Sequence, residues 1–88
     1  MLIAKVIGNV WTTQKESGMD HLKLLIVQPV NLQEKKQEDA LVAVDRIGAG
    51  TGELVIITQG SPAQRLMGDQ NAPIDAAVVG IVDSYETT

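Results

Sequence analysis

Few residues of this 88-residue chain combine the types and the spacing that chemistry requires. A catalytic site needs a nucleophile, an acid–base pair or a set of metal ligands. His21 is the single histidine, and with Asp20 it offers two ligands in one turn, which are too few to hold a metal. Ser61 lies in Gly60-Ser61-Pro62, which differs from the Gly-x-Ser-x-Gly elbow of serine hydrolases. The sequence therefore predicts a protein that is not an enzyme and has no catalytic, metal or cofactor site.

A glycine-rich segment, Gly48-Ala49-Gly50-Thr51-Gly52, superficially resembles a dinucleotide-binding loop. Such a loop must begin a helix inside a βαβ unit, whereas a strand-like run from Leu54 follows here. We therefore interpret the glycines as positions of positive φ or of close backbone approach, for example to a neighbouring subunit. The carboxylates are expected on loops and strand ends, facing solvent: Asp45, Glu53, Asp69, Asp75, Asp83 and Glu86.

The net charge of −4 and the pI of about 4.7 argue against nucleic-acid binding, because phosphates are neutralised by basic side chains. They also argue against an anionic membrane surface. Trp11 and Tyr85 are the only aromatic residues, too few for base stacking. No apolar run approaches the ~20 residues of a membrane helix, and no basic stretch precedes an apolar one at the N-terminus. We expect a cytoplasmic protein with neither a membrane span nor a signal peptide.

Alternating polar and apolar residues indicate short strands that a single domain, residues 1–88, must arrange. Gly8 predicts a bulge or bend, and Pro29 predicts a strand edge or end because proline donates no ladder hydrogen bond. The polar stretch Asn31–Asp39 is interpreted as a solvated loop, and residues 13–20 as a hairpin loop. The five predicted strands are residues 2–12, 21–28, 40–45, 54–59 and 76–85.

One helix is predicted, from Pro62 to Met67, just before the last strand. Ser61 can cap its N-terminus, Gln64 completes a capping box, and Gly68 is a typical stop. Five strands and one short helix in so small a chain predict an all-β fold. The expected architecture is a small, partly open five-stranded β-barrel of the oligonucleotide/oligosaccharide-binding (OB) type.

The fourth and fifth predicted strands are apolar on both faces, although a small barrel has only one inside. Leu54 and Ile56 alternate with Val55 and Ile57, and the run from Ala76 to Val79 is also apolar. The chain has no cysteine, so oligomerisation is the remaining common way to stabilise such a small domain. We expect another copy of the chain to cover the outer face.

Five segments in order carry a resemblance to the EutN/CcmL-type vertex proteins of bacterial microcompartments, over nearly the whole chain. The segments are Leu2–Gly8 with Thr12–Lys15, Lys23–Val27, Ala43–Val55, Gly60-Ser61 with Ala63 and Arg65, and Ile74–Asp83. The resemblance implies a homopentamer that caps the vertices of a polyhedral shell, with hexameric shell proteins as partners and no reaction of its own. The alternative is a small oligomeric barrel that binds an anionic metabolite or a protein partner, with an anion site at the helix N-terminus at Ser61.

The segments that match the family's most recognisable motifs are predicted to lie at subunit contacts or around the central opening. Arg65 is expected to reach a carboxylate or carbonyl of the next subunit, or else to face solvent. The predicted interface or pore residues are Gly48, Ala49, Gly50, Thr51, Gly52, Glu53, Ser61, Ala63 and Arg65.

Overall fold

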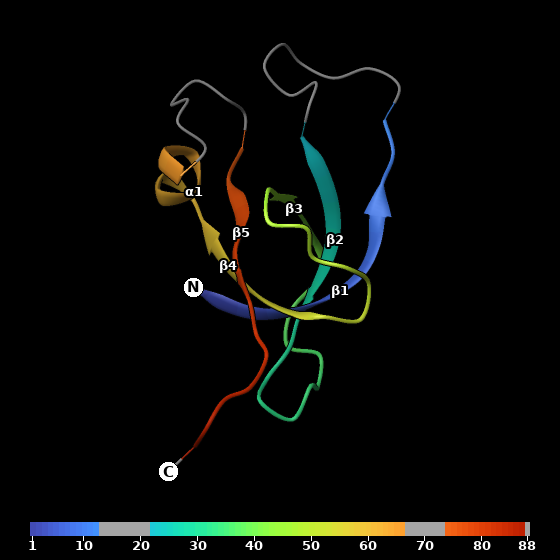
Figure 1. The fold of residues 1–88 in the computed structure, drawn as a ribbon, viewed down its shortest axis with the longest axis vertical. Coiled ribbons are helices and arrows are strands. Elements are labelled where there is room, and N and C mark those ends of the chain that lie inside the picture. Colours follow the sequence, from blue (N-terminus) through green and yellow to red (C-terminus); the bar gives the residue numbers. More distant parts are fainter. Residues whose placement is uncertain (13–21, 67–73, 88) are drawn as a thin grey trace.

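The computed structural model describes residues 1–12, 22–66 and 74–87 (Figure 1). The predicted hairpin loop at 13–20, His21, Gly68, Asp69 and the side chain of Gln64 lie outside the described residues. The elements in chain order are β1 (Leu2–Val10), β2 (Lys23–Pro29), β3 (Leu41–Asp45), β4 (Leu54–Gln59), α1 (Ser61–Leu66) and β5 (Ala76–Ile81).

The strands form a closed barrel in the order β1-β2-β3-β5-β4. Four of the five neighbouring pairs are antiparallel, and β3 and β5 pair in parallel through Val44 and Ala77. The predicted all-β class, the five strands and the helix before the last strand are confirmed. The expectation of a partly open barrel is wrong, because the β3–β5 pairing joins the two strands that would otherwise be edges.

The barrel interior is built from aliphatic side chains, as a chain without phenylalanine requires. Alternate residues of a strand point to opposite faces, so every second residue enters the core. Leu25, Val27, Val55 and Ile57 are among the largest side chains that are almost fully buried there. The buried core residues are Ala4, Val6, Leu25, Val27, Ala43, Ala49, Val55, Ile57, Ala76 and Val78.

Two register shifts bend the barrel. The first lies between Val6 and Gly8 of β1, which confirms the bulge predicted at Gly8. The second lies between Ile56 and Ile57 of β4, and no sequence feature indicated it. Pro29 is the last residue of β2, as its missing N–H predicted.

The ends of five elements differ from the prediction. β2 runs from Lys23 to Pro29 rather than over residues 21–28, and β3 begins at Leu41, one residue late. β1 ends at Val10 rather than at residue 12, and α1 begins at Ser61, one residue early. β5 ends at Ile81, four residues short, because the chain beyond it leaves the barrel (Figure 1). That segment is attached through the Tyr85 hydroxyl, which donates to the Leu32 carbonyl at 2.7 Å.

The loop between β2 and β3 is solvent-exposed, as predicted, and it is also held by hydrogen bonds. The Asn31 carboxamide oxygen accepts from the amides of Gln33 and Lys35 at 2.9 and 3.0 Å. The Lys5 ammonium and the Glu34 carboxylate form an exposed ion pair at 3.2 Å, which ties the loop to β1. This loop lies at the opposite end of the barrel from α1 (Figure 1).

The outer face of the barrel is covered only in part by the chain itself. Val44 and Ile74 form a second buried cluster with the half-buried Leu22 and Leu24. Other large apolar side chains remain at the surface. These are Met1, Ile7, Trp11, Leu32, Val42, Ile47, Leu66 and Tyr85.

Candidate assembly surface

The loop that follows β3 is organised by one carboxylate. The two oxygens of Asp45 accept hydrogen bonds from the backbone amides of Ile47 at 2.9 Å, Gly48 at 3.2 Å and Ala49 at 2.7 Å. Lys23, which faces Asp45 across the β2–β3 ladder, places its ammonium 3.8 Å from the carboxylate and donates to the Ala49 carbonyl at 3.0 Å. Asp45 thereby folds the chain back so that Ala49 enters the barrel core.

The expectation that Asp45 faces solvent is wrong, because its side chain is fully buried. The three amides and the ammonium replace the water that a carboxylate would otherwise need, so burial is compatible with its charge. A signal for this role was present in the sequence. An aspartate at a strand end with a glycine three residues later is typical of a turn in which the carboxylate accepts amide hydrogens from the following residues.

Two glycines of the loop adopt backbone conformations that other residues rarely adopt. Gly48 has φ of 101° and Gly52 has φ of 92°, which confirms the positive φ expected for this segment. Gly50 is not in that region; its amide instead donates to the Glu53 carboxylate at 2.6 Å. The Gly52 amide donates to the Val6 carbonyl at 2.8 Å, which ties the loop to β1.

Replacing Gly48 with alanine is expected to lower the free energy of unfolding by about 1–2 kcal/mol. A Cβ at Gly48 would meet no atom within 4 Å, so the cost comes from backbone strain alone. Gly80→Ala is the matched control. There a Cβ would also meet no atom within 4 Å, and φ is ordinary. Thermal unfolding of both variants tests the difference, and equal melting temperatures would contradict the assignment.

The second predicted segment lies on α1. Gly60 turns the chain out of β4 with φ of 73°, and its amide donates to the Asp75 carbonyl at 2.7 Å. Ala63 is fully buried beneath the helix, while Ser61 and Arg65 are exposed. The helix therefore exposes Ser61, Pro62, Arg65 and Leu66 to solvent, and among its described side chains Ala63 is the one buried against the barrel.

The nine predicted interface residues lie in two separate places, the loop between β3 and β4 and the helix α1. Ala49 and Ala63 have no exposed surface in the single chain. The others are exposed or half-exposed and stay a prediction: Gly48, Gly50, Thr51, Gly52, Glu53, Ser61 and Arg65. Among the described residues, no hydrogen bond or ion pair joins the loop group to the helix group. The contact that links the two regions is made by their neighbours, Arg46 and Leu66.

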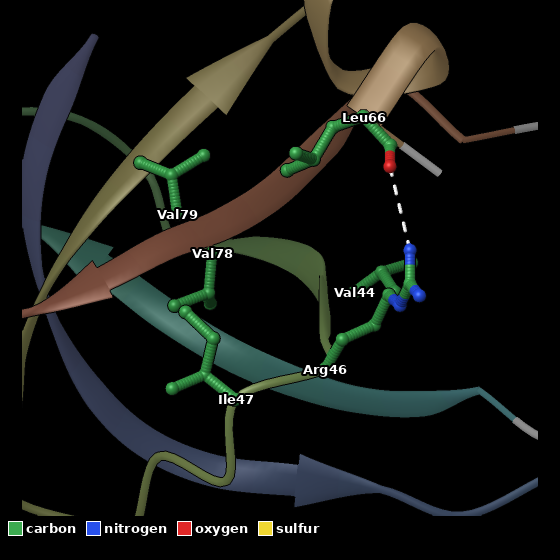
Figure 2. Close-up of a pocket in the computed structure, with 6 residues that line it drawn as sticks. All are labelled: Val44, Arg46, Ile47, Leu66, Val78 and Val79. Atoms are coloured by element: carbon green, nitrogen blue, oxygen red, sulfur yellow. Dashed lines mark hydrogen bonds between the residues drawn. The ribbon is translucent and has the colours of Figure 1, made fainter. Parts of the chain in front are cut away.

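That contact crosses an apolar groove outside the barrel, with a volume of about 280 Å³ (Figure 2). The guanidinium of Arg46 donates from Nη1 to the Leu66 carbonyl, the last of α1, at 3.4 Å. The groove lies where β3, β5 and the end of α1 meet. It is lined by Val44, Arg46, Ile47, Leu66, Val78 and Val79.

Sequence reasoning missed this groove because its residues come from three elements that only the fold brings together. Its lining is five aliphatic side chains and one cation, which suits a contact surface rather than a reaction. Within residues 1–12, 22–66 and 74–87, no three His, Cys, Asp or Glu side chains gather closely enough to hold a metal ion. No helix in the described part of the chain is long and apolar enough to span a membrane.

Comparison with known proteins gives a family for this fold. The family described as "Ethanolamine utilisation protein EutN/carboxysome" matches residues 1–83. The chain is 47% identical over 89 residues to the bacterial microcompartment shell vertex protein GrpN of Rhodospirillum rubrum, covering 99% of this chain and 98% of GrpN. It is 44% identical over 85 residues to the carboxysome shell vertex protein CcmL of Nostoc, covering 96% of this chain and 84% of CcmL.

A solved structure supports the same relationship. The structure of the GrpN pentameric microcompartment shell protein from Rhodospirillum rubrum superposes with a TM-score of 0.87 at 44% identity. The alignment covers 99% of this chain and all of the GrpN chain. With the family match over residues 1–83 and a closed five-stranded barrel of the same shape, this chain belongs to the EutN/CcmL family.

Proposed function

We propose that this chain is a structural subunit that forms a homopentamer at the vertices of a bacterial microcompartment shell and catalyses no reaction. The observation that carries the proposal is the full-length likeness to a pentameric microcompartment shell protein, at 44% identity and a TM-score of 0.87. Relatives across the family are named as shell vertex proteins, from microcompartments and from carboxysomes alike.

The physical properties of the surface support assembly. Identical subunits joined head to tail close into a ring when the rotation between them is right, and each subunit then needs two different contact patches. Exposed apolar side chains lie on β1, on β3, after β3 and on α1, represented by Ile7, Val42, Ile47 and Leu66. A domain of this size buries a modest fraction of its surface, so association adds stability that the single barrel lacks.

The proposed partners are hexameric shell proteins of a microcompartment in the cytoplasm. Six-fold tiles alone pack into a flat layer, and a closed polyhedral shell requires five-fold units at its corners. A pentamer of this small barrel is suited to such a corner. No observation favours the alternative of an anionic ligand at Ser61, because α1 has only six residues and Ser61 lies exposed at its start.

Native mass spectrometry of the purified chain at micromolar concentration is expected to show a species with five times the 9.4 kDa mass of one chain. A stable monomer as the dominant species would contradict the proposal. Dilution provides the control, because a specific ring dissociates at a defined subunit concentration whereas non-specific aggregates give a range of masses.

Co-expression with a hexameric shell protein tests the vertex role separately. We expect closed polyhedral particles when both proteins are present, and open or elongated shells when this chain is left out. Electron microscopy distinguishes these shapes. Closed particles of the same shape and number without this chain would contradict the vertex role while leaving the pentamer intact.

A further inference from the structure

Exposed apolar side chains gather around the groove between β3, β5 and α1. Ile47 is 51% exposed and Leu66 is 48% exposed, although both line the groove. Val42 is 49% exposed and lies two residues before Val44, hence on the same outer face of β3. These side chains come from separate elements, so their concentration on one side of the barrel is a property of the fold. Concentrated apolar surface of this kind marks a contact site more often than scattered single residues do.

The walls of the groove are held in place by the chain itself. Asp45 binds the amide of Ile47 and directs the chain past the rim of the groove. Arg46 spans the opening to the Leu66 carbonyl, as Figure 2 shows. Two fixed walls mean that little conformational freedom is lost when another surface fills the groove, and preorganisation of this kind favours binding.

Unpaired positive charge borders this apolar surface. Arg46 lies at the groove, and Arg65 is exposed on α1 one residue before the lining residue Leu66. The ion pairs of the described residues involve Lys5 and Lys23, and neither arginine. The chain as a whole carries 11 acidic and 7 basic residues, so another copy of it brings surplus carboxylates to a basic rim. The exposed carboxylates of another copy, among them Glu53, Asp75 and Asp83, are therefore available to pair with the two arginines.

We propose that this groove is the surface on which a second copy of the chain docks in the pentamer, a statement that rests on the function proposed above. The apolar lining excludes water, and Arg46 keeps its hydrogen bond to Leu66 while its remaining guanidinium N–H groups pair with a carboxylate of the neighbouring copy. The groove is one of the two patches that a head-to-tail ring needs. The neighbouring copy supplies the other.

Cysteine labelling tests the proposal without breaking the assembly, since the chain has no cysteine of its own. Ile47→Cys is compared with Leu32→Cys, which replaces a residue 42% exposed on the loop between β2 and β3, at the opposite end of the barrel from α1. In the assembled protein we expect maleimide to label Ile47→Cys at least about tenfold more slowly than Leu32→Cys, each relative to its own rate in denaturant. Equal relative rates in the pentamer would overturn the proposal.

Substitutions that add or remove charge at the groove test the same surface by their effect on assembly. Ile47→Glu and Leu66→Glu are each expected to raise the subunit concentration needed for half-assembly by at least about tenfold, because an unpaired carboxylate would be buried in the interface. Leu32→Glu is the control and is expected to change that concentration by less than about twofold. Arg46→Gln is expected to weaken assembly and to reduce its dependence on salt, whereas Arg46→Lys retains that dependence.

The outcomes separate this inference from the proposed function. A monomeric wild-type chain would overturn both. A pentameric wild type in which Ile47→Glu and Leu66→Glu assemble normally would overturn the inference alone. A third outcome would also overturn the inference. If Ile47→Cys is labelled freely in the pentamer and more slowly only when hexameric shell protein is added, the groove belongs to that partner.

Discussion

Replacing Asp45 with alanine is expected to lower the free energy of unfolding by about 3 kcal/mol. The substitution removes the acceptor of three backbone amides, those of Ile47, Gly48 and Ala49, and leaves the Lys23 ammonium without its carboxylate. Because the side chain is fully buried, water reaches these groups only if the loop rearranges. A loss of this size is a large fraction of the ~5–15 kcal/mol that holds a domain folded.

Chemical denaturation followed by circular dichroism measures this loss, at one fixed subunit concentration because assembly adds its own stabilisation. Asp45→Asn retains one acceptor oxygen and is expected to lose less than Asp45→Ala. Lys23→Met removes only the cation, whose side chain is 48% exposed, and is expected to cost less than about 1 kcal/mol. A denaturation midpoint for Asp45→Ala equal to that of Lys23→Met would show that the amide contacts contribute nothing.

Ile57→Ala is expected to lower the free energy of unfolding by about 3 kcal/mol, through a different cause. Ile57 lies in the middle of β4, is fully buried and packs in the barrel core. Truncation removes apolar contacts and leaves a cavity in the core. The strands of a closed barrel surround this cavity and cannot easily move inward to fill it. Protein interiors are packed to high density, so the neighbouring side chains have little room to shift into such a cavity.

Ile56→Ala is the matched control, one residue earlier on the same strand and only half-buried. It faces out of the barrel, so truncation is expected to cost the fold less than about 1 kcal/mol. Denaturation curves of the two variants at two subunit concentrations separate barrel stability from assembly. A larger loss for Ile56→Ala than for Ile57→Ala at both concentrations would mean that the inside and outside of β4 have been assigned the wrong way round.

Asp45 and the groove are parts of one arrangement. The carboxylate directs the chain so that Ala49 enters the core while Ile47 remains outside at the groove. A single buried charge thus connects the stability of the barrel to the shape of the surface proposed for docking. Asp45→Ala is accordingly expected to weaken assembly as well as folding, and the loss of assembly should persist at denaturant concentrations where the barrel is still folded.

The sequence by itself determined the features that depend on neighbouring residues. Alternation predicted the five strands, Gly8 predicted a bulge, Pro29 predicted a strand end, and Ser61-Pro62 predicted the short helix. These signals are local because side-chain direction, φ and hydrogen-bond donation are properties of one residue and its neighbours. Ordered motifs along the chain were also enough to identify the family.

Only the tertiary structure decided which of these surfaces are inside and which are open. The β3–β5 pairing closed the barrel through residues 33 positions apart, Val44 and Ala77, and so removed the free edges that a partly open barrel would have. Ile74 covered part of the outer face next to Val44, while Ile47 and Leu66 stayed exposed. The sequence predicted Asp45 to be a surface carboxylate, and only the fold places the backbone amides that surround it. Burial depends on contacts between residues far apart in the chain, and no local pattern of residue types encodes which of them will meet.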